Sequence, residues 1–395
     1  MRNNNFGTPK TGEDFKDGVI IIEIAKFGVE EWLNTWEKKA RYDISQSSIA
    51  ALTLKELAVL TDTNITVFLE KHAHKALDYG WIEGSPNFKS LVAKLYQKIS
   101  ADNVLQTNGA TGANFLAMYA LLNPGDHVVT MFPTYQQLYD IPRSFGVQVD
   151  FVYLEENSDW QLEVDKLAAA VTPATKMICL NNANNPTGTL LSQEKLTRIA
   201  AIARKVGAYV LVDEVYAPLL AGEEFVSIAD VYENGIATNS LSKTYSLPGL
   251  RIGWIASRNS EVIELMRKYR DYTLISSGVL DNELAELALT NKEKIIQRNQ
   301  KIVSENLETV KKWVVKEPRV DLVLPHYVST SFIKLIIPED DYSFCVSLLK
   351  NTGVLLVPGT VFGIPQHARL GYCCDKEILK KGLALLSQYL RKFDV

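Results

Sequence analysis

The chain has 395 residues, of which 47% are hydrophobic and 22% are charged, and its formal net charge is −4. This length allows one large domain and a smaller one, and the composition is ordinary for a globular protein. The small acidic excess argues against a dedicated nucleic-acid-binding protein, and the sequence has no run of 18 apolar residues that would span a membrane. The N-terminus shows no signal-peptide pattern, so we expect a cytoplasmic protein without membrane or nucleic-acid partners.

The cysteines and histidines do not indicate a metal site. The five histidines are scattered, and the four cysteines lack the spacing of zinc ligands. Reduced thiols in a cytosolic protein are the plain interpretation of Cys179, Cys345, Cys373 and Cys374.

The first hundred residues are expected to hold a loose arm followed by three helices. Residues 1–17 are polar, and residues 18–24 form an apolar run that suits a strand or a packed extension. The spacing of apolar residues predicts helices over residues 29–41, 53–60 and 87–99. Thr53, with Glu56 three residues later, is typical of a capped helix start.

From residue 127 onward, apolar strand-like runs alternate with helical ones. The predicted strands are residues 127–131, 147–153, 176–180, 209–212, 236–241 and 252–256. Helices are predicted over residues 115–122 and 196–206. This alternation indicates an α/β protein with a mainly parallel sheet and helices on both faces.

The last third indicates a smaller α+β unit. It contains predicted helices at residues 299–316 and 376–391 and strand-like runs at 333–337 and 354–357. We expect this unit to gather both ends of the chain. The predicted division is residues 1–50 as the arm and part of the small domain, 51–290 as the large domain, and 291–395 as the C-terminal small domain.

The most informative stretch surrounds Lys243. This lysine lies among hydroxyl residues, and such a lysine can form an imine with an aldehyde cofactor. Ser240, Ser242 and Arg251 offer short donors and one fixed charge, which suit a phosphate. One small molecule, pyridoxal 5′-phosphate, carries both an aldehyde and a phosphate. An isolated Ser-x-Ser-Lys motif is more often a surface turn, so this interpretation depends on the rest of the chain.

Other polar residues follow predicted strands, which is where ligands bind in open α/β sheets. Gly109 and Ala110 belong to a small-residue turn before a helix, whose backbone N–H groups can hold a phosphate. Tyr135 follows the strand at residues 127–131. It can stack on a flat ring, although a tyrosine packed under a loop fits the sequence equally well.

Two further strands end in polar motifs. Asn185 belongs to an asparagine-rich turn after residues 176–180, and one of these asparagines can donate to a phenolate oxygen. Asp213 ends the strand at residues 209–212, and a buried carboxylate there needs a partner such as a protonated pyridine nitrogen. Tyr216, three residues further on, can reach a ring hydroxyl.

These motifs follow one another in a characteristic order and spacing: Asn185-Pro-Thr-Gly, Asp213-x-x-Tyr216, Ser240-x-Ser242-Lys243 and Arg251. As an ordered set they resemble the class I/II aminotransferases, which are fold type I pyridoxal phosphate enzymes. The match extends from about residue 79 to residue 369. It implies an enzyme that moves an amino group between an L-amino acid and a 2-oxo acid, working as a homodimer with shared active sites.

The resemblance also implies a role for each cofactor residue. Lys243 would form the Schiff base and carry the proton, and Asp213 would bind the pyridine nitrogen. Asn185 and Tyr216 would bind the 3-oxygen of the ring, on which Tyr135 would stack. The phosphate ligands would be Ser240, Ser242, Arg251 and the backbone of Gly109 and Ala110.

Two residues would complete the site by the same resemblance. Tyr79 would reach the phosphate in the neighbouring subunit. Arg369 and Asn185 would bind the substrate, and Arg369 would hold its α-carboxylate through paired hydrogen bonds. By charge alone, Arg369 is equally consistent with a surface arginine.

The N-terminal part departs from the common family pattern. Many relatives carry a Gly-x-Pro-type turn over the substrate, whereas residues 42–49 of this chain lack it. The tryptophans of residues 32–36, the Ser47-Ser48 pair and residues 109–114 are more similar to the capreomycidine synthase-like subgroup. An elimination or a cyclisation of an amino acid therefore stays open beside transamination. A non-enzymatic ligand-binding protein of the same fold is a third alternative, although no DNA-binding extension is visible.

Overall fold

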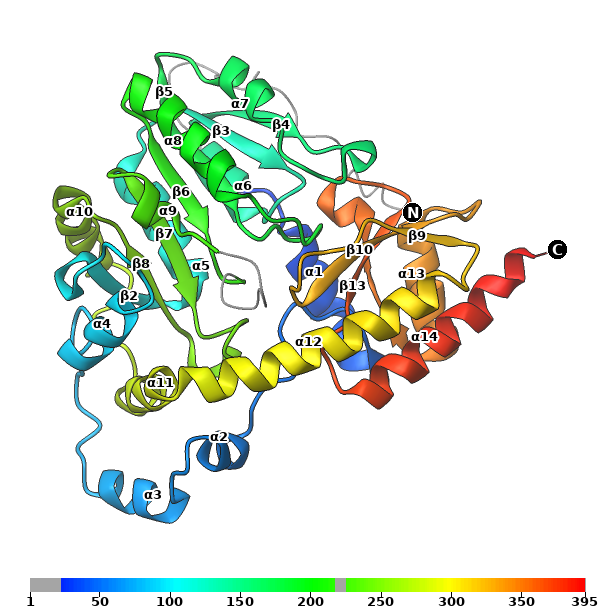
Figure 1. Cartoon of the computed structure of the whole chain (residues 1–395), viewed down its shortest axis with the longest axis horizontal. Coiled ribbons are helices and arrows are strands. Elements are labelled where there is room, and N and C mark those ends of the chain that lie inside the picture. The colour runs from blue at the N-terminus through cyan, green and yellow to red at the C-terminus, as the bar shows by residue number, and fades with distance from the viewer. Residues whose placement is uncertain (1–22, 217–224, 395) are drawn as a thin grey trace.

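A seven-stranded sheet forms the centre of the larger part of the molecule (Figure 1). The computed structural model describes residues 23–216 and 225–394, so the expected arm at residues 1–17 and most of the run at 18–24 lie outside them. The strands are β2 (Val104–Asn108), β3 (His127–Phe132), β4 (Gln148–Tyr153), β5 (Thr175–Asn181), β6 (Tyr209–Asp213), β7 (Gly235–Ser240) and β8 (Ile252–Ala256).

The sheet order is β2-β8-β7-β6-β5-β3-β4. Neighbours from β7 to β4 pair in parallel, whereas β8 is antiparallel to both β7 and β2. This confirms the predicted α/β class, and all six predicted strands are present. The strand β2 was not predicted, because its second half, Gln106-Thr107-Asn108, is polar.

Helices cover both faces of the sheet. Successive residues of a strand point to opposite faces, so the apolar strands supply buried side chains to both layers. One face packs against α5 (Gly109–Leu121), α6 (Gln137–Ser144) and α10 (Ser260–Arg270). The other face packs against α4 (Pro86–Ala93), α7 (Val164–Ala170), α8 (Gln193–Val206), α9 (Ile228–Val231) and α11 (Val279–Thr290). On β5, for example, Met177 and Cys179 contribute to the first core and Ile178 and Leu180 to the second.

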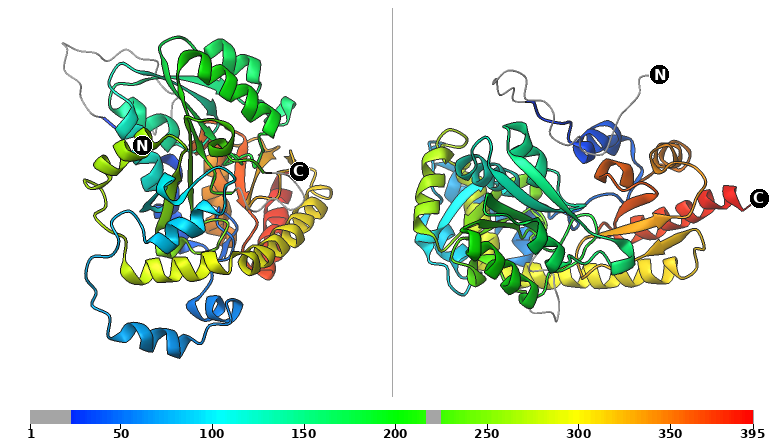
Figure 2. Two further views of the ribbon diagram at one scale, coloured as in Figure 1. Left: turned by 60° about the vertical axis from the view of Figure 1, so that its left-hand side comes forward. Right: turned by 90° about the horizontal axis from the view of Figure 1, so that it is seen from above.

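A second, antiparallel sheet lies beside the first (Figure 2). Its order is β12-β13-β10-β9, with β9 (Val320–Leu322), β10 (Thr330–Leu335), β12 (Val357–Pro358) and β13 (His367–Gly371). Segments from both ends of the chain meet here, since β1 (Tyr42–Asp43) pairs with β11 (Val354–Leu355). The domain boundaries themselves stay predictions.

Helices from both ends of the chain complete the structure. The early ones are α1 (Gly28–Trp36), α2 (Leu54–Leu60) and α3 (Ile65–Ala73), and the late ones are α12 (Lys292–Val314), α13 (Asp341–Thr352) and α14 (Lys376–Leu390). The capping box at Thr53 and Glu56 is confirmed. In the described part of the chain, no helix is long and apolar enough to cross a membrane.

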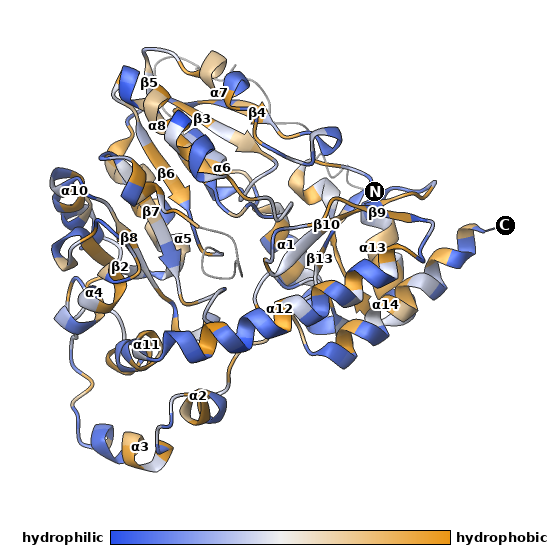
Figure 3. Cartoon of the chain, viewed as in Figure 1, coloured by the Kyte–Doolittle hydropathy of each residue, from blue (hydrophilic) through white to orange (hydrophobic). Residues whose placement is uncertain are grey.

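Several helix ends differ from the predicted ones. The helix α5 begins at Gly109 rather than residue 115, since its small, mostly buried residues show no amphipathic period. The helix α12 begins at Lys292 rather than residue 299, and its polar and apolar residues alternate along its length (Figure 3). The helices α1 and α4 end at Trp36 and Ala93, before residues 41 and 99, where the chain tightens into short turns.

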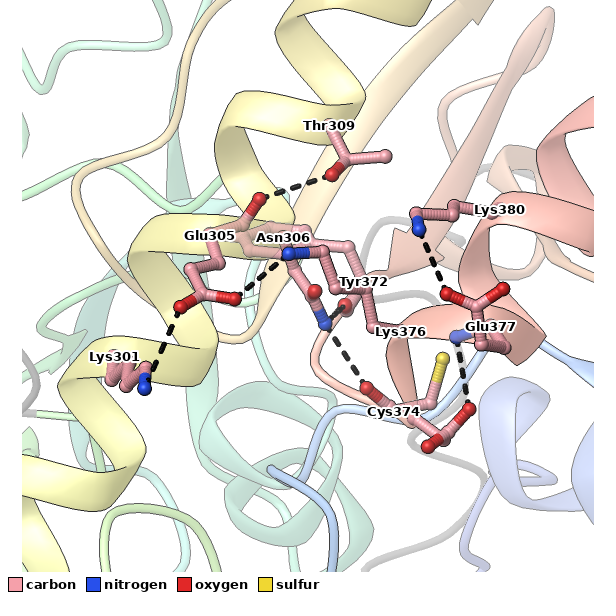
Figure 4. A network of polar contacts seen from close by, with 10 residues as sticks. Lys301, Glu305, Asn306, Thr309, Tyr372, Cys374, Lys376, Glu377 and Lys380 are labelled. Carbon is pink, nitrogen blue, oxygen red and sulfur yellow. Dashed lines mark hydrogen bonds and ion pairs between the residues drawn. The ribbon is translucent and has the colours of Figure 1, made fainter.

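The long helix α12 holds the end of β13 in place (Figure 4). The Asn306 side chain is buried and donates from Nδ2 to the carbonyls of Tyr372 (2.8 Å) and Cys374 (3.0 Å). Glu305 accepts from Lys376 of α14 at 2.8 Å. These contacts fix the strand that carries Arg369.

Candidate active site

The carboxyl ends of β5, β6 and β7 meet at the edge of the sheet that faces the smaller part (Figure 1). Asn181 and Asp213 are register partners at the ends of β5 and β6, and the Asn181 side chain donates to the Asp213 carbonyl at 3.0 Å. Ser240 ends β7. Parallel strands with a common direction therefore bring three of the sequence motifs to one place.

Asp213 is buried, with 3% of its surface exposed. Its Oδ2 accepts from Asn114 Nδ2 at 2.8 Å, and its Oδ1 accepts from the Val215 backbone at 3.2 Å. Burial raises the pKa of this carboxyl, and the two hydrogen bonds and the charge of Lys243 oppose that rise. A buried carboxylate in this setting is stabilised by a cation, which a protonated ring nitrogen would supply.

Lys243 is half-buried and donates from Nζ to the Ser47 hydroxyl at 2.7 Å. Burial, followed by the positive charge of Arg369, lowers the pKa of its ammonium to about 8. The negative charges of Glu30 and Asp213 act in the opposite direction. The neutral, nucleophilic form of this amine is therefore much more populated near neutral pH than that of an ordinary lysine.

Tyr216 is buried directly after β6. Burial raises the pKa of its phenol to about 12, while the charge of Arg369 and hydrogen bonds with Ser47 and Ser329 lower it. Ser329 also donates its hydroxyl to the Ser47 carbonyl. The phenol therefore stays protonated at neutral pH and is available as a hydrogen-bond donor.

Arg369 is buried on β13 and faces the same site. Its Nη1 donates to Asn185 Oδ1 at 3.2 Å, and its Nε and Nη2 donate to the Ser45 carbonyl at 3.3 and 3.0 Å. The guanidinium lies 5.5 Å from the centre of the Phe362 ring. The structure thus places Arg369 in the interior beside Asn185, so the surface alternative for this arginine is wrong.

Hydrogen-bond donors of Arg251 and Ser242 lie beside the first residue of α5. Arg251 Nη1 lies 3.4 Å from the Ser242 hydroxyl, and a Cβ added to Gly109 would come within 2.6 Å of Arg251 Nη2. Gly109 has a positive φ of 67°, which favours glycine. Gly253 lets β8 approach the backbone of Gly109 and Ala110 just as closely. Small residues and one arginine therefore form an anion cradle at the positive end of a 13-residue helix.

Tyr135 lies between α1 and the rest of the site. Its ring centre is 5.3 Å from that of Phe27, and its hydroxyl bonds to Thr111. Burial raises the pKa of this phenol, and the negative charge of Glu30 raises it further.

Tyr79 is the one predicted residue that the structure does not bring to this site. It is 75% exposed and lines a separate surface cavity of about 800 Å³, together with Trp81, Asn282 and Glu286. This position fits a residue that acts on a neighbouring subunit, and that role stays a prediction.

Sequence reasoning missed several residues at the site. The sequence indicates Asn114 only as part of the small-residue turn. In the structure Asn114 lies inside α5, where its Oδ1 accepts from Thr238 at 2.6 Å and its Nδ2 donates to Asp213. A buried asparagine within an apolar helix is the signal that would have found it. Ser45 and Ser47 belong to residues 42–49, which depart from the family pattern, and nothing local indicates their contacts with Arg369 and Lys243.

The residues present fit pyridoxal 5′-phosphate. The cradle at Gly109 and Arg251 suits its phosphate, and the buried Asp213 suits its ring nitrogen. The Asn185 oxygen is engaged by Arg369, so its amide N–H groups are left to face a ring oxygen. Lys243 offers the amine that the aldehyde requires.

The shifted pKa of Lys243 leads to a measurable pH dependence. In the cofactor-free protein, labelling of Lys243 by an amine reagent should rise with a midpoint near pH 8, because the neutral amine reacts. In Arg369→Gln the midpoint should move to higher pH, since a neighbouring positive charge is removed. A midpoint near the ordinary lysine value of about 10.4 in the unaltered protein would contradict this environment.

The same shift affects stability in a defined direction. The folded-state pKa lies below the ordinary lysine value of 10.5, so the neutral amine is the form that folding favours. Lys243 therefore opposes folding most strongly below pH 8, and this penalty declines as the pH rises from about 8 to 10.5.

Comparisons with known proteins agree with this geometry. A family model described as aminotransferase class I and II matches residues 51–386. Capreomycidine synthase from Streptomyces vinaceus is 28% identical over 92% of this chain and 93% of its own length. An aspartate aminotransferase from Thermotoga maritima is 30% identical over 82% of this chain and 85% of its own length.

Solved structures give the same result. A pyridoxal phosphate-dependent aminotransferase from Streptococcus suis superposes with a TM-score of 0.92 at 50% identity, covering 94% of this chain and 99% of its own. The pyridoxal phosphate-dependent cyclase OrfR superposes with a TM-score of 0.85 at 27% identity, covering 94% and 98%. The chain therefore belongs to the class I and II aminotransferase family of fold type I enzymes, whose cofactor is pyridoxal 5′-phosphate.

Proposed function

We propose that this protein is an aminotransferase that moves an amino group between an L-amino acid and a 2-oxo acid. One observation carries the proposal: the Lys243 amine donates to Ser47 and the buried Arg369 guanidinium donates to Ser45, two residues away, so both groups face one site. The lowering of the Lys243 pKa by the charge of Arg369 agrees with this arrangement, in which one small molecule would engage both groups. An amino acid presents such a pair, an amine and a carboxylate, on adjacent carbons.

The cofactor would be held by groups from several elements. Asp213 would bind the ring nitrogen, Asn185 and Tyr216 the 3-oxygen, and Tyr135 one face of the ring. The phosphate ligands would be Ser240, Ser242, Arg251 and the backbone of Gly109 and Ala110. When bound, this group withdraws electrons from the α-carbon of the substrate and so acidifies its proton.

The proton transfer itself is assigned to Lys243. Its neutral Nζ would take the α-proton as a general base and would return a proton as a general acid. Ser47 Oγ, 2.7 Å away, keeps the amine pointing into the site. A pKa near 8 suits both roles, because the amine can change its protonation state at a pH close to neutral.

Arg369 would fix the substrate carboxylate. Its guanidinium is held by Asn185 and by the Ser45 carbonyl, so its orientation is set before the substrate arrives. A planar, pre-oriented guanidinium binds a carboxylate through two parallel hydrogen bonds. This contact would also align the bond to the α-proton with the Lys243 amine.

We further propose a homodimer with Tyr79 reaching the neighbouring site. Large apolar side chains are exposed on the Tyr79 segment, with Leu77 77% and Trp81 59% exposed, and on the segment just before Ser276, to which the Gly80 backbone donates, with Tyr272 90% and Ile275 54% exposed. Burying them against a second copy would remove this area from water. Sedimentation velocity should therefore give twice the mass of one chain, and Trp81→Glu should shift the protein toward monomer. A wild-type protein that sediments as a monomer would contradict the shared site.

A second candidate function is an elimination or cyclisation on the same scaffold. It is favoured by the similarity to capreomycidine synthase and to the OrfR cyclase. It is also consistent with residues 42–49, which replace the common substrate turn and bring the Ser47 hydroxyl to Lys243.

Single-turnover spectra with each of the twenty amino acids separate the two functions. Transamination should convert the bound cofactor to pyridoxamine 5′-phosphate and release one 2-oxo acid per active site. Release of ammonia or of a ring product, with no pyridoxamine 5′-phosphate, would reject transamination in favour of the second candidate.

A further inference from the structure

The first turn of α1 is fixed against the active site. The Phe27 ring lies 5.3 Å from the Tyr135 ring, and the Gly28 backbone donates to Gln136 Oε1 at 2.8 Å. One turn further along the helix, Trp32 Nε1 donates to the Leu356 carbonyl at 2.9 Å. A Cβ added to Gly28 would come within 2.8 Å of the Val361 carbonyl, so the helix packs closely there. This turn is therefore held beside the tyrosine proposed to stack on the cofactor.

Glu30 stands on this turn, three residues after Phe27, and so on the same side of the helix. Its side chain is exposed, and its carboxylate makes neither a hydrogen bond nor an ion pair with any described residue. Its negative charge nevertheless raises the pKa of Lys243, Arg369 and Tyr135. These three residues come from separate elements that meet at the site, and the turn that carries Glu30 packs on this site through Phe27 and Gly28. The packing and the direction of the three pKa effects agree in placing Glu30 beside the site.

The other acidic groups at the site already have partners. Asp213 is held by Asn114 and the Val215 backbone, and Asp43 accepts from the Ser45 hydroxyl and the Gln46 amide. Asp140 accepts from Gln136 and Arg143. Among the residues that the structure describes, Glu30 is therefore the carboxylate at this site that is left to meet the substrate.

We propose that Glu30 determines substrate specificity by pairing with a cationic side chain of the amino acid. The inference rests on the proposed function, in which Arg369 takes the α-carboxylate and the α-amine is consumed in the reaction. The side chain is then the part of the substrate that faces α1. A cationic side chain gains an ion pair with Glu30, whereas a dicarboxylic amino acid would place two carboxylates near each other.

Glu31 provides a matched control on the same turn. It carries the same group one residue further on, but it pairs with Lys26 at 3.5 Å and is not among the charges that act on Lys243. Both glutamates are exposed, so neither glutamine variant should disturb folding.

The first test compares kcat/KM for lysine, arginine and ornithine with that for leucine and aspartate. The unaltered protein should prefer the cationic group. Glu30→Gln should lower kcat/KM for these substrates roughly 10- to 100-fold and leave leucine within about threefold, while Glu31→Gln changes neither. Conversion of amino acids without this preference would overturn the Glu30 assignment and leave the aminotransferase proposal standing. A protein that reacts with no amino acid would overturn both.

The second test uses the cofactor-free protein and does not depend on turnover. Removing the negative charge in Glu30→Gln should move the pH midpoint for labelling of Lys243 to lower pH, because the ammonium loses a stabilising neighbour. Glu31→Gln should leave the midpoint in place. Equal midpoints in the unaltered protein and Glu30→Gln would show that Glu30 does not face the site.

Discussion

Replacing Lys243 by alanine should abolish the visible absorbance that the unaltered protein shows with pyridoxal 5′-phosphate. The reason is covalent: the aldehyde needs an amine at this position, and Lys243 is the lysine beside Asp213 and Arg369 whose pKa is lowered to about 8. Turnover should fall by several orders of magnitude, because the same amine is proposed to move the proton. Absorbance and stopped-flow assays measure the two effects separately.

Lys195 is the control for this variant. Burial also lowers the pKa of its amine, but Lys195 lies on α8 and donates to Gln161. Lys195→Ala should keep both the visible band and the turnover. An unchanged band in Lys243→Ala would mean that another lysine holds the cofactor.

Replacing Asp213 by alanine should reduce turnover by at least about 10²- to 10³-fold while some cofactor stays bound. The carboxylate is proposed to keep the ring nitrogen protonated, and without that charge the α-proton is less acidic. The phosphate cradle at Gly109 and Arg251 does not depend on Asp213, so binding should weaken less than catalysis. Rapid-quench measurement of the first turnover, with a separate titration of cofactor, tests this division.

The next residue, Glu214, supplies the comparison. It is equally buried, and it accepts from Ser227 and the Ile228 backbone instead of facing the site. Burial raises the pKa of its carboxyl to about 8, so it is mostly neutral at pH 7 and glutamine is a close replacement. Glu214→Gln should therefore react almost normally. If Asp213→Ala also turned over at nearly the unaltered rate, the ring-nitrogen role would be wrong.

The parts of the fold that were predictable are those set by local pattern. Strands such as β5 and β6 are continuous apolar runs buried on both faces, and each ends in a polar motif, so periodicity and position agree. The strand β2 could not be predicted in this way, because Gln106, Thr107 and Asn108 are polar. It is recognisable only from its pairing with β8, which lies about 150 residues later in the sequence.

The residues of the site also fall into those that the sequence predicts and those that it does not. The residues at strand ends, such as Asp213 and Ser240, could be predicted because chain direction alone brings them together. Ser47 reaches Lys243 across 196 residues, and the Ser45 carbonyl reaches Arg369 across 324 residues. No periodicity connects such pairs, because they meet only when the smaller part of the molecule packs on the edge of the sheet.

Glu30 shows why specificity is harder to predict than chemistry. In the sequence it is one of two adjacent glutamates in an amphipathic helix, and either would be read as a solvated surface charge. The structure distinguishes them, because Glu31 pairs with Lys26 whereas the charge of Glu30 acts on Lys243 and Arg369. The positions of the cofactor residues are set by the strands of the sheet. The position of Glu30 is set instead by the packing of the separate helix α1 on the site.

The central claim is that one lysine carries the cofactor, and reductive trapping tests it most directly. The protein loaded with pyridoxal 5′-phosphate is treated with borohydride, digested and mapped by mass spectrometry. We predict a single modified peptide, with the label on Lys243. A label on a different lysine, or a protein that takes up no label, would contradict the account.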